Sequence, residues 1–233
     1  QLPNAMKYTP FLLFFILLAC GGSKQETPQE SNDQEAEAVV ENDAPEEPPI
    51  ANPTNIIDYF ALLQWKNQVD DYYIFVQHDG KYVCVENLGD EFDYSGSLDE
   101  IRLYPSTVDI KNGYLNIEDE GTGEGLYTFE VALFRKPDNS YIIAVSGFGS
   151  YPPHMDQYLG SAPKFFVWQN NEFTDVSKDV LPAISVAEGY SEYYRLPQIG
   201  RVIKHTQYSA DSGESITTQL EFSSSTGTFI QKN

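Results

Sequence analysis

Residues 72–87 read YYIFVQHDGKYVCVEN, and this stretch indicates the class of fold. The central Asp-Gly dipeptide is typical of a two-residue type I′ turn, because both turn positions need a positive φ angle. Such a turn pairs Val76 with Val83 on one face of a hairpin and Phe75 with Cys84 on the other. The hydrophobic pattern and the turn chemistry therefore agree on one antiparallel register.

An Asn-Gly dipeptide within residues 108–118 predicts a second hairpin of the same kind. A two-residue turn at this dipeptide pairs Ile110 with Leu115 on the buried face. It leaves Asn116 on the outward face, because successive side chains of a strand alternate.

Further hairpins and two helices complete the expected fold. Asn55 followed by Asp58 is a helix-start signal, and it predicts a helix that ends near Lys66. A brief helix is expected over residues 177–182. Turn signals predict these strands: 126–135 with 141–147, 164–169 with 172–175, 201–208 with 215–222, and a last strand at 228–231. The expected class is mainly β, an antiparallel and hairpin-rich sandwich or barrel-like sheet with one N-terminal helix.

Composition limits the function. The 233 residues include 35 acidic and 14 basic side chains, and the formal net charge is −21. A chain this acidic is not expected to bind nucleic acid, because it would repel the phosphate backbone. Two cysteines do not make a disulfide scaffold, whereas 32 aromatic residues indicate a folded core.

The N-terminal segment has the pattern of a signal peptide. Lys7 precedes an apolar run over residues 11–18, and Ala19 then precedes Cys20. Eight residues of helix rise only about 12 Å, which is too short to cross a hydrocarbon core about 30 Å thick. We expect a signal peptide over residues 1–19, with Met6 as the start and residues 1–5 upstream of it.

The sequence Leu17-Leu18-Ala19-Cys20 resembles the lipobox of bacterial lipoproteins. The resemblance implies cleavage before Cys20 and acylation of this cysteine with diacylglycerol and a further fatty acid such as palmitate. Residues 20–24 would then be the lipidated N-terminus, and the acyl chains would hold the protein on the membrane. Gly21 stands where an aspartate would retain a lipoprotein in the inner membrane. The implied location is the outer membrane, facing the periplasm or the cell surface.

Residues 25–53 differ in composition from the rest of the chain. They contain nine acidic residues, five prolines, no lysine or arginine and no aromatic residue. Such a segment buries too little apolar surface to fold, so we predict a disordered acidic tether. An acidic tail that binds calcium or a partner is the alternative. The remaining residues, 54–233, are expected to form a single β-rich globular domain.

Four stretches of this domain resemble a set of uncharacterised bacterial secreted or lipoprotein domains. The resemblance implies a common fold and no particular activity. The stretches are DYFALL (58–63), VDIKNGYL (108–115), ALFRKPD (132–138) and FTDVSKDVLP (173–182).

Two acidic loops, residues 90–102 and 118–125, are calcium candidates because carboxylate oxygens are the ligands that this cation prefers. The first loop is not an EF-hand, since Arg102 occupies the position that needs a bidentate glutamate. A looser site remains open, and the alternative is a pair of solvated loops. The candidate ligands are Glu91, Asp93, Asp99, Glu118 and Glu120.

Two further sets of residues bear on possible sites. Cys84 is expected to be an unpaired buried cysteine, because His78 falls on the opposite face of the hairpin and cannot serve as its base. Tyr151, His154 and Tyr158 fall in a predicted long loop after Gly147. They are candidates for a recognition surface, and the alternative is an ordinary connection that covers the sheet edge.

The favoured function is a lipid-anchored cell-envelope protein that acts as a non-catalytic binding module, with an unknown protein or glycan partner and no cofactor. A carboxylate-dependent glycoside hydrolase acting on envelope or extracellular polysaccharide is one alternative, with acid pairs such as Asp70-Asp71 or Asp99-Glu100. A structural component of an envelope assembly is another. Two carboxylates facing each other in a deep pocket would favour the enzyme, and a flat aromatic patch on a sheet face would favour binding. If every aromatic side chain were buried, the binding hypothesis would lose its basis.

Overall fold

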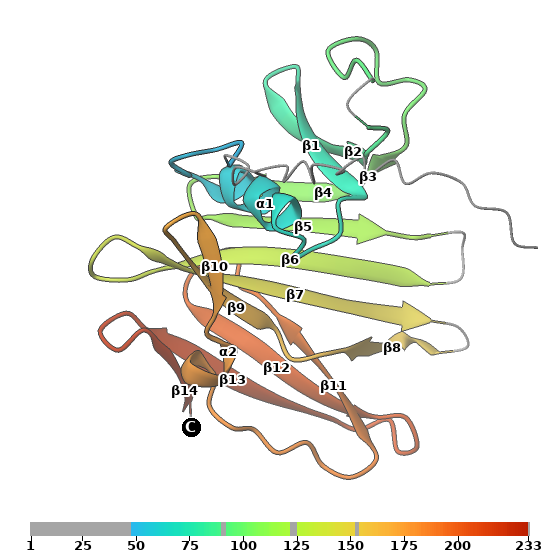
Figure 1. Ribbon diagram of the computed structural model, residues 1–233. Helices are drawn as coiled ribbons and strands as arrows, with labels where there is room; N and C mark the ends of the chain where they lie inside the picture. Colours follow the sequence, from blue (N-terminus) through green and yellow to red (C-terminus); the bar gives the residue numbers. More distant parts are fainter. Residues whose placement is uncertain (1–47, 90–91, 122–124, 152–153, 233) are drawn as a thin grey trace, which may run out of the picture. The chain divides into compact units, whose positions relative to one another are not determined.

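Three antiparallel β-sheets and two helices make up the part of the chain that the computed structural model describes (Figure 1). This part covers residues 48–89, 92–121, 125–151 and 154–232, without the side chains of residues 150–159. The expected mainly β class is confirmed, and the described strands form a sandwich of sheets rather than a closed barrel. None of the described helices has the length and apolar character that a membrane crossing requires.

The first helix, α1 (Ile56–Trp65), begins and ends where the sequence predicts. The side chain of Asn55 accepts hydrogen bonds from the backbone N–H groups of Ile57 and Asp58, and the Asp58 carboxylate accepts one from Asn55 N. This reciprocal capping box satisfies N–H groups that have no partner inside the helix. The buried face consists of Ile56, Tyr59, Phe60, Leu62 and Leu63.

The first sheet contains β1 (Tyr73–His78), β2 (Lys81–Glu86) and the two-residue β3 (Leu103–Tyr104). The turn at Asp79 and Gly80 has φ angles of 49° and 73°, as a type I′ turn requires. The register is the predicted one and sets Phe75 opposite Cys84. The sequence did not predict β3, which adds Tyr104 next to Cys84.

The second sheet has seven strands in the order β10-β9-β7-β6-β5-β4, with β8 also paired to β7. All its pairs are antiparallel. The strand after the Pro137-Asp138-Asn139 turn is longer than predicted. The bounds are β4 Ser106–Asp109, β5 Tyr114–Asp119, β6 Leu126–Arg135, β7 Tyr141–Tyr151, β8 His154–Gly160, β9 Lys164–Gln169 and β10 Glu172–Asp175.

The predicted register of the second hairpin is wrong. Leu115 pairs with Val108, so the turn has four residues, and Ile110 lies within it with 43% of its surface exposed. Asp109 explains the longer turn, because its carboxylate accepts hydrogen bonds from Asn112 N at 3.0 Å and from Asn112 Nδ2 at 2.7 Å. Asn116 was expected to point outward but is buried, and its side chain accepts a hydrogen bond from a backbone N–H.

The third sheet has the order β11-β12-β13-β14. The sequence predicts three of its strands but not β11, whose polar and aromatic residues show no apolar alternation. The short helix α2 (Ser177–Val180) lies before this sheet in the chain, as predicted. The strand bounds are β11 Tyr190–Arg195, β12 Val202–Ser209, β13 Ser215–Ser223 and β14 Thr228–Lys232.

The seven-stranded sheet is covered on both faces. Ala132 and Phe134 of β6 pack with Ile203 and Phe222 of the third sheet, which makes the sandwich core. The alternate residues of β6, such as Val131, belong to a second core with α1 and the first sheet. Because α1 has only ten residues, it covers part of this second face. The part it leaves uncovered positions the candidate site.

Candidate functional site

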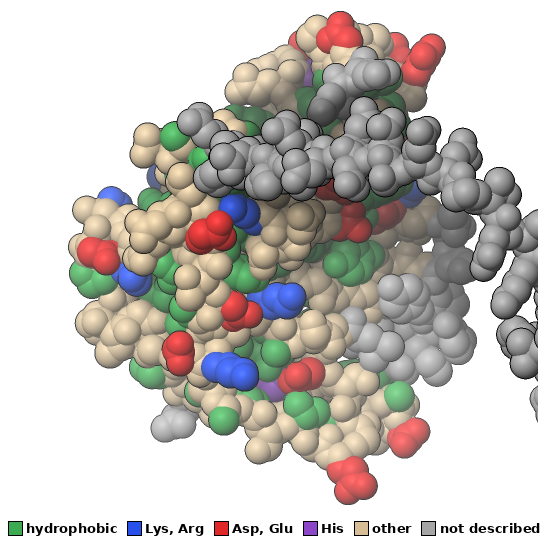
Figure 2. Space-filling model, in the orientation of Figure 1, with side chains coloured by type: hydrophobic (Ala, Val, Ile, Leu, Met, Phe, Trp, Pro, Cys, Tyr) green, Lys and Arg blue, Asp and Glu red, His purple; other side chains and the backbone are tan. Residues whose placement is uncertain are grey.

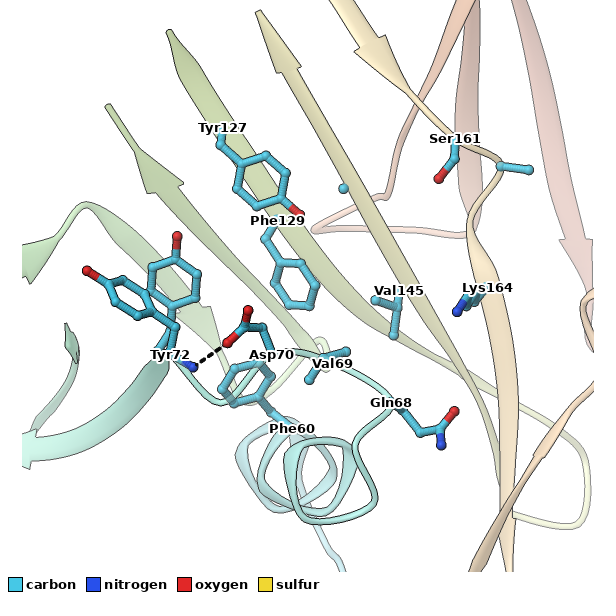
Figure 3. A pocket seen from close by; sticks show the side chains of 13 residues that line it. Phe60, Gln68, Val69, Asp70, Tyr72, Tyr127, Phe129, Val145, Ser161 and Lys164 are labelled. Atoms are coloured by element: carbon cyan, nitrogen blue, oxygen red, sulfur yellow. Dashed lines mark hydrogen bonds between the residues drawn. The ribbon is translucent and has the colours of Figure 1, made fainter. Parts of the chain in front are cut away.

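A cavity of about 440 Å³ opens on the α1 side of the seven-stranded sheet (Figure 3). Its walls come from α1, the segment between α1 and β1, the start of β1, and the face of β6, β7 and β9. The lining residues are Phe60, Gln68, Val69, Asp70, Tyr72, Tyr73, Tyr127, Phe129, Val145, Gly147, Ser161, Ala162 and Lys164.

Aromatic side chains dominate the walls. Five of the thirteen lining residues are aromatic. In Figure 3, Tyr127 and Phe129 extend from β6, Phe60 rises from α1, and Tyr72 closes one side. Tyr72 and Tyr127 each keep 37% of their surface exposed, so a ligand can reach their rings. Aromatic side chains that are partly exposed therefore occur at this cavity.

Gly147 makes room for one of these rings. A Cβ atom at Gly147 would lie 2.5 Å from the hydroxyl oxygen of Tyr127 and 3.3 Å from its Cζ atom. In the β6–β7 register, Gly147 lies opposite Phe129, so Tyr127 leans diagonally across the glycine. The missing side chain therefore sets how Tyr127 lies over the floor of the cavity.

The charged groups of the lining lie on opposite sides of the cavity in Figure 3. Asp70 lies beside Tyr72 and accepts a hydrogen bond from the Tyr72 backbone N–H at 2.8 Å. Lys164 lies beyond Val145, its partner in the β7–β9 register. Among the described lining residues, Asp70 and Lys164 are the charged ones.

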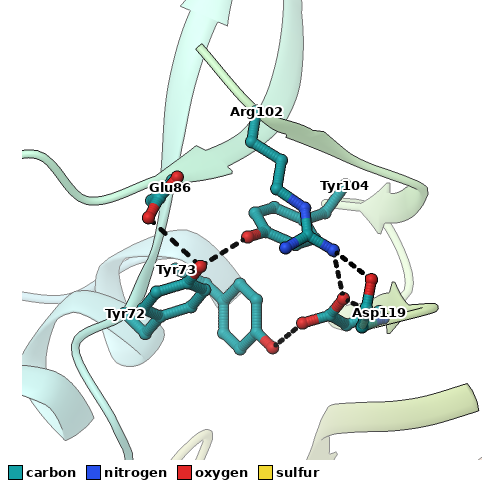
Figure 4. A network of polar contacts seen from close by, with 7 residues as sticks. Tyr72, Tyr73, Glu86, Arg102, Tyr104 and Asp119 are labelled. Carbon is teal, nitrogen blue, oxygen red and sulfur yellow. Dashed lines mark hydrogen bonds and ion pairs between the residues drawn. The ribbon is translucent and has the colours of Figure 1, made fainter. Parts of the chain in front are cut away.

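Tyr73 is held in place from behind the cavity (Figure 4). Its hydroxyl donates a hydrogen bond to Asp119 Oδ2 at 2.8 Å, and Arg102 Nη2 donates to the other oxygen of Asp119 at 2.9 Å. Burial, followed by the hydrogen bond to Asp119, raises the pKa of Tyr73 above its ordinary value. This tyrosine therefore stays a neutral donor, and its ring has a fixed orientation.

Tyr72 is fixed by a second set of contacts shown in Figure 4. Its hydroxyl donates to Glu86 Oε1 at 3.1 Å and accepts from the Tyr104 hydroxyl at 2.9 Å. Burial and this hydrogen bond raise the pKa of Tyr104. The rings of Tyr72 and Tyr73 meet at 89° with centroids 5.0 Å apart, which is a favourable edge-to-face contact. Tyr72 and Tyr73 together form what we call the tyrosine wall, and contacts outside the cavity hold it in place.

The residues predicted as a recognition loop take a different backbone form. Tyr151 lies at the end of β7, while His154 and Tyr158 lie in β8, so the predicted long loop is a β-hairpin. The apolar alternation that marks other strands is weak there, which is why the sequence did not indicate it. The side chains of all three residues lie outside the described part, and their role in recognition stays a prediction.

The calcium candidates are only partly described. Glu91 lies outside the described residues. The carboxylate of Asp93 accepts hydrogen bonds from Ser95 N at 2.9 Å and Ser95 Oγ at 2.6 Å, and these bonds lower the pKa of Asp93. Asp99 and Glu120 are exposed, and Glu118 is half-buried. No group of three His, Cys, Asp or Glu residues within the described ranges is arranged to hold a metal ion.

Arg102, which excludes an EF-hand in its loop, contacts Asp119 and Tyr104. Its guanidinium pairs with Asp119 at 2.9 Å and stacks 4.8 Å from the ring centroid of Tyr104. It therefore supports the tyrosine wall from the far side.

Acidic and basic side chains are interspersed on the face of the molecule that Figure 2 shows.

Cys84 is a free, buried cysteine, as the sequence predicts. Burial raises the pKa of its thiol to about 12. His78 pairs with Lys81 in the hairpin register and lies on the other face from Cys84. A thiolate nucleophile at this position is not supported.

Sequence reasoning did not find the cavity. In the sequence, Asp70 stands out only as half of an acid pair, and no motif points to Tyr127 or Lys164. One signal was available, since a glycine such as Gly147 inside an apolar strand often marks the close approach of another group.

Comparison with known proteins gives little further information. No family model and no curated protein matches this chain. One solved structure is similar, a domain of an uncharacterized protein from Porphyromonas gingivalis W83. The match has a TM-score of 0.39 and 9% sequence identity, and it covers 75% of this chain and 88% of the other. A match this distant supports no argument about function.

Proposed function

We propose that this protein is a lipid-anchored component of the bacterial cell envelope whose β-rich domain binds a small ligand, or one side chain of a larger partner, without catalysing a reaction. The aromatic cavity carries the proposal. Its volume of about 440 Å³ falls within the range of roughly 300–1,000 Å³ that is usual for small-ligand sites. An apolar lining with a few polar groups is also usual for such sites.

The lining favours binding over glycoside hydrolysis. Hydrolysis by the usual mechanism needs two carboxyl groups about 5–9 Å apart on either side of the scissile bond. Among the described lining residues, Asp70 is the one carboxylate. Asp99, from the other acid pair, lines a separate cavity of about 390 Å³ with His78 and Leu103.

The proposed location at the membrane is based on the sequence pattern at Cys20, a residue that lies outside the described part of the chain. We propose that an acylated Cys20 anchors the protein in the outer membrane and that residues 25–53 separate the domain from the lipid surface. Cys20→Ala should move the protein from the membrane fraction to the soluble fraction. A variant that stays in the membrane fraction would contradict the anchor.

Filling the cavity tests the binding function. Ala162 is exposed and lines the cavity, so Ala162→Trp should occupy it without disturbing the core. Ala183 is exposed and lies outside the lining, which makes Ala183→Trp a matched control. The full chain is screened against glycan, peptide and metabolite panels. Hits that Ala162→Trp abolishes and Ala183→Trp retains support the proposal. No saturable hit, or hits that both variants retain, would refute binding in this cavity.

A further inference from the structure

The polar groups of the cavity are divided by sign. Asp70 lies beside Tyr72, and Lys164 lies beyond Val145, with Ser161 farther along the same segment of the chain (Figure 3). Phe129 and Val145 lie between the two sides in this view. A ligand that fits both ends would therefore carry a positive group, an apolar middle and a negative group.

The tyrosine end offers ring surfaces more than hydroxyl groups. The hydroxyl of Tyr72 is bound to Glu86, and the hydroxyl of Tyr73 is bound to Asp119. A sugar needs several hydrogen-bond partners at this end, and these two hydroxyls are already engaged. Aromatic ring faces carry partial negative charge and attract an alkylated ammonium group by cation–π interaction.

Behind this wall, the two carboxylates of Asp119 and Glu86 face one guanidinium, that of Arg102, so the net charge there is negative. Asp119, whose side chain is 15% exposed, accepts the hydrogen bond of Tyr73, and it contributes to the raised pKa of that tyrosine. In front of the wall, one oxygen of Asp70 accepts a single backbone hydrogen bond. An anion placed here would be repelled by Asp70, whereas Arg102 partly offsets the charge of Asp119.

A metal ion fits this end less well than an organic cation. Calcium takes six to eight oxygen ligands. Asp70 is the one carboxylate that the described lining supplies, and its neighbours are aromatic rings. An alkylated ammonium group is large, weakly hydrated and suited to ring faces.

From this arrangement we propose that the cavity recognises a small organic zwitterion. Its alkylated ammonium group lies against Tyr72, Tyr73 and the carboxylate of Asp70. Its carboxylate reaches Lys164, and a short alkyl chain passes over Phe129. This inference rests on the proposed binding function and names the ligand class of the same cavity.

The test uses three matched probes and the full chain in calorimetric titrations. The first probe is γ-butyrobetaine, which carries both charges. The second is butyltrimethylammonium, which lacks the carboxylate, and the third is the carbon isostere of γ-butyrobetaine, in which a tert-butyl group replaces the trimethylammonium group. We expect γ-butyrobetaine to bind about tenfold more tightly than butyltrimethylammonium and more than tenfold more tightly than the isostere.

Single substitutions test which residue binds each charged end of the ligand. Asp70→Asn should weaken both ammonium probes about tenfold, whereas Asp71→Asn, an exposed neighbour outside the lining, should leave them unchanged. Lys164→Met should weaken γ-butyrobetaine about tenfold and leave butyltrimethylammonium unchanged. The substituted residues are exposed, so these variants should fold, and a thermal melt checks this.

The outcomes separate this inference from the proposed function. Equal affinity for γ-butyrobetaine and its isostere, or an equal effect of Asp70→Asn and Asp71→Asn, would overturn recognition of the ammonium group. Absence of binding by all three probes would overturn the zwitterion inference too. The proposed function would still stand if the panel screen gave other ligands that Ala162→Trp abolishes.

Discussion

Replacing Glu130 by alanine is expected to destabilise the fold by about 2–6 kcal/mol, because it removes the acceptor of two buried hydrogen-bond donors. The Glu130 side chain is 1% exposed inside the sandwich. Its carboxylate accepts hydrogen bonds from Leu196 N at 2.7 Å and from the Tyr114 hydroxyl at 3.0 Å, and it lies 3.3 Å from Arg195 Nε. Alanine would leave the buried Leu196 and Tyr114 donors unpaired, at a cost of about 1–3 kcal/mol each.

The conservative substitution Glu130→Gln is expected to change how the unfolding free energy depends on pH. Burial raises the pKa of Glu130 above its ordinary value of 4.5, although Leu196 N and Arg195 oppose the shift. In the pH range just above 4.5, the folded protein therefore binds more protons at this site than the unfolded chain does. The free energy of unfolding contributed by Glu130 falls as pH rises through this range. Glu130→Gln keeps an acceptor for Leu196 N and should remove this dependence.

Urea unfolding followed by circular dichroism at pH 5 and pH 7 measures both effects. The unfolding free energy of Glu130→Gln minus that of the native chain should be larger at pH 7 than at pH 5. Glu188→Gln, an exposed control, should show no such difference. A loss below about 1 kcal/mol for Glu130→Ala, or an unchanged pH dependence for Glu130→Gln, would refute the reasoning.

Three other substitutions or reactions test the cavity and the core. Gly147→Ala should displace the exposed Tyr127 ring, costing less than about 1 kcal/mol of stability while weakening ligand binding, as melting and titration would show. Tyr73→Phe keeps the ring but removes the hydrogen bond to the charged Asp119, so urea unfolding should show a loss of about 1.5–3 kcal/mol. Cys84, with its thiol pKa raised to about 12, should resist iodoacetamide at pH 8 until the protein unfolds, and rapid alkylation seen by mass spectrometry would contradict its burial.

Local turn chemistry explains which strands could be predicted. The turn at Asn170 and Asn171 has φ angles of 52° and 62°, and it joins residues 164–169 to residues 172–175 as the sequence predicts. The register predicted from Asn112-Gly113 is wrong because the side chain of Asp109 accepts hydrogen bonds from Asn112, which gives a turn of four residues.

The cavity could not be predicted by such local rules. Asp70, Tyr127 and Lys164 are far apart in the sequence, and they come together only because α1 leaves part of the sheet face uncovered. How a helix lies across a sheet depends on packing between distant residues, which turn chemistry and periodicity do not describe.

Chemical-shift mapping tests the central claim most directly, the claim that this cavity is the ligand site. The isotope-labelled full chain is titrated with γ-butyrobetaine, and amide shifts are followed by NMR. We predict that the largest shifts cluster in residues 68–73 and 161–164 and at Phe129 and Gly147, around the cavity. Saturable shifts confined to the third sheet, β11–β14, with no change around the cavity, would contradict the account.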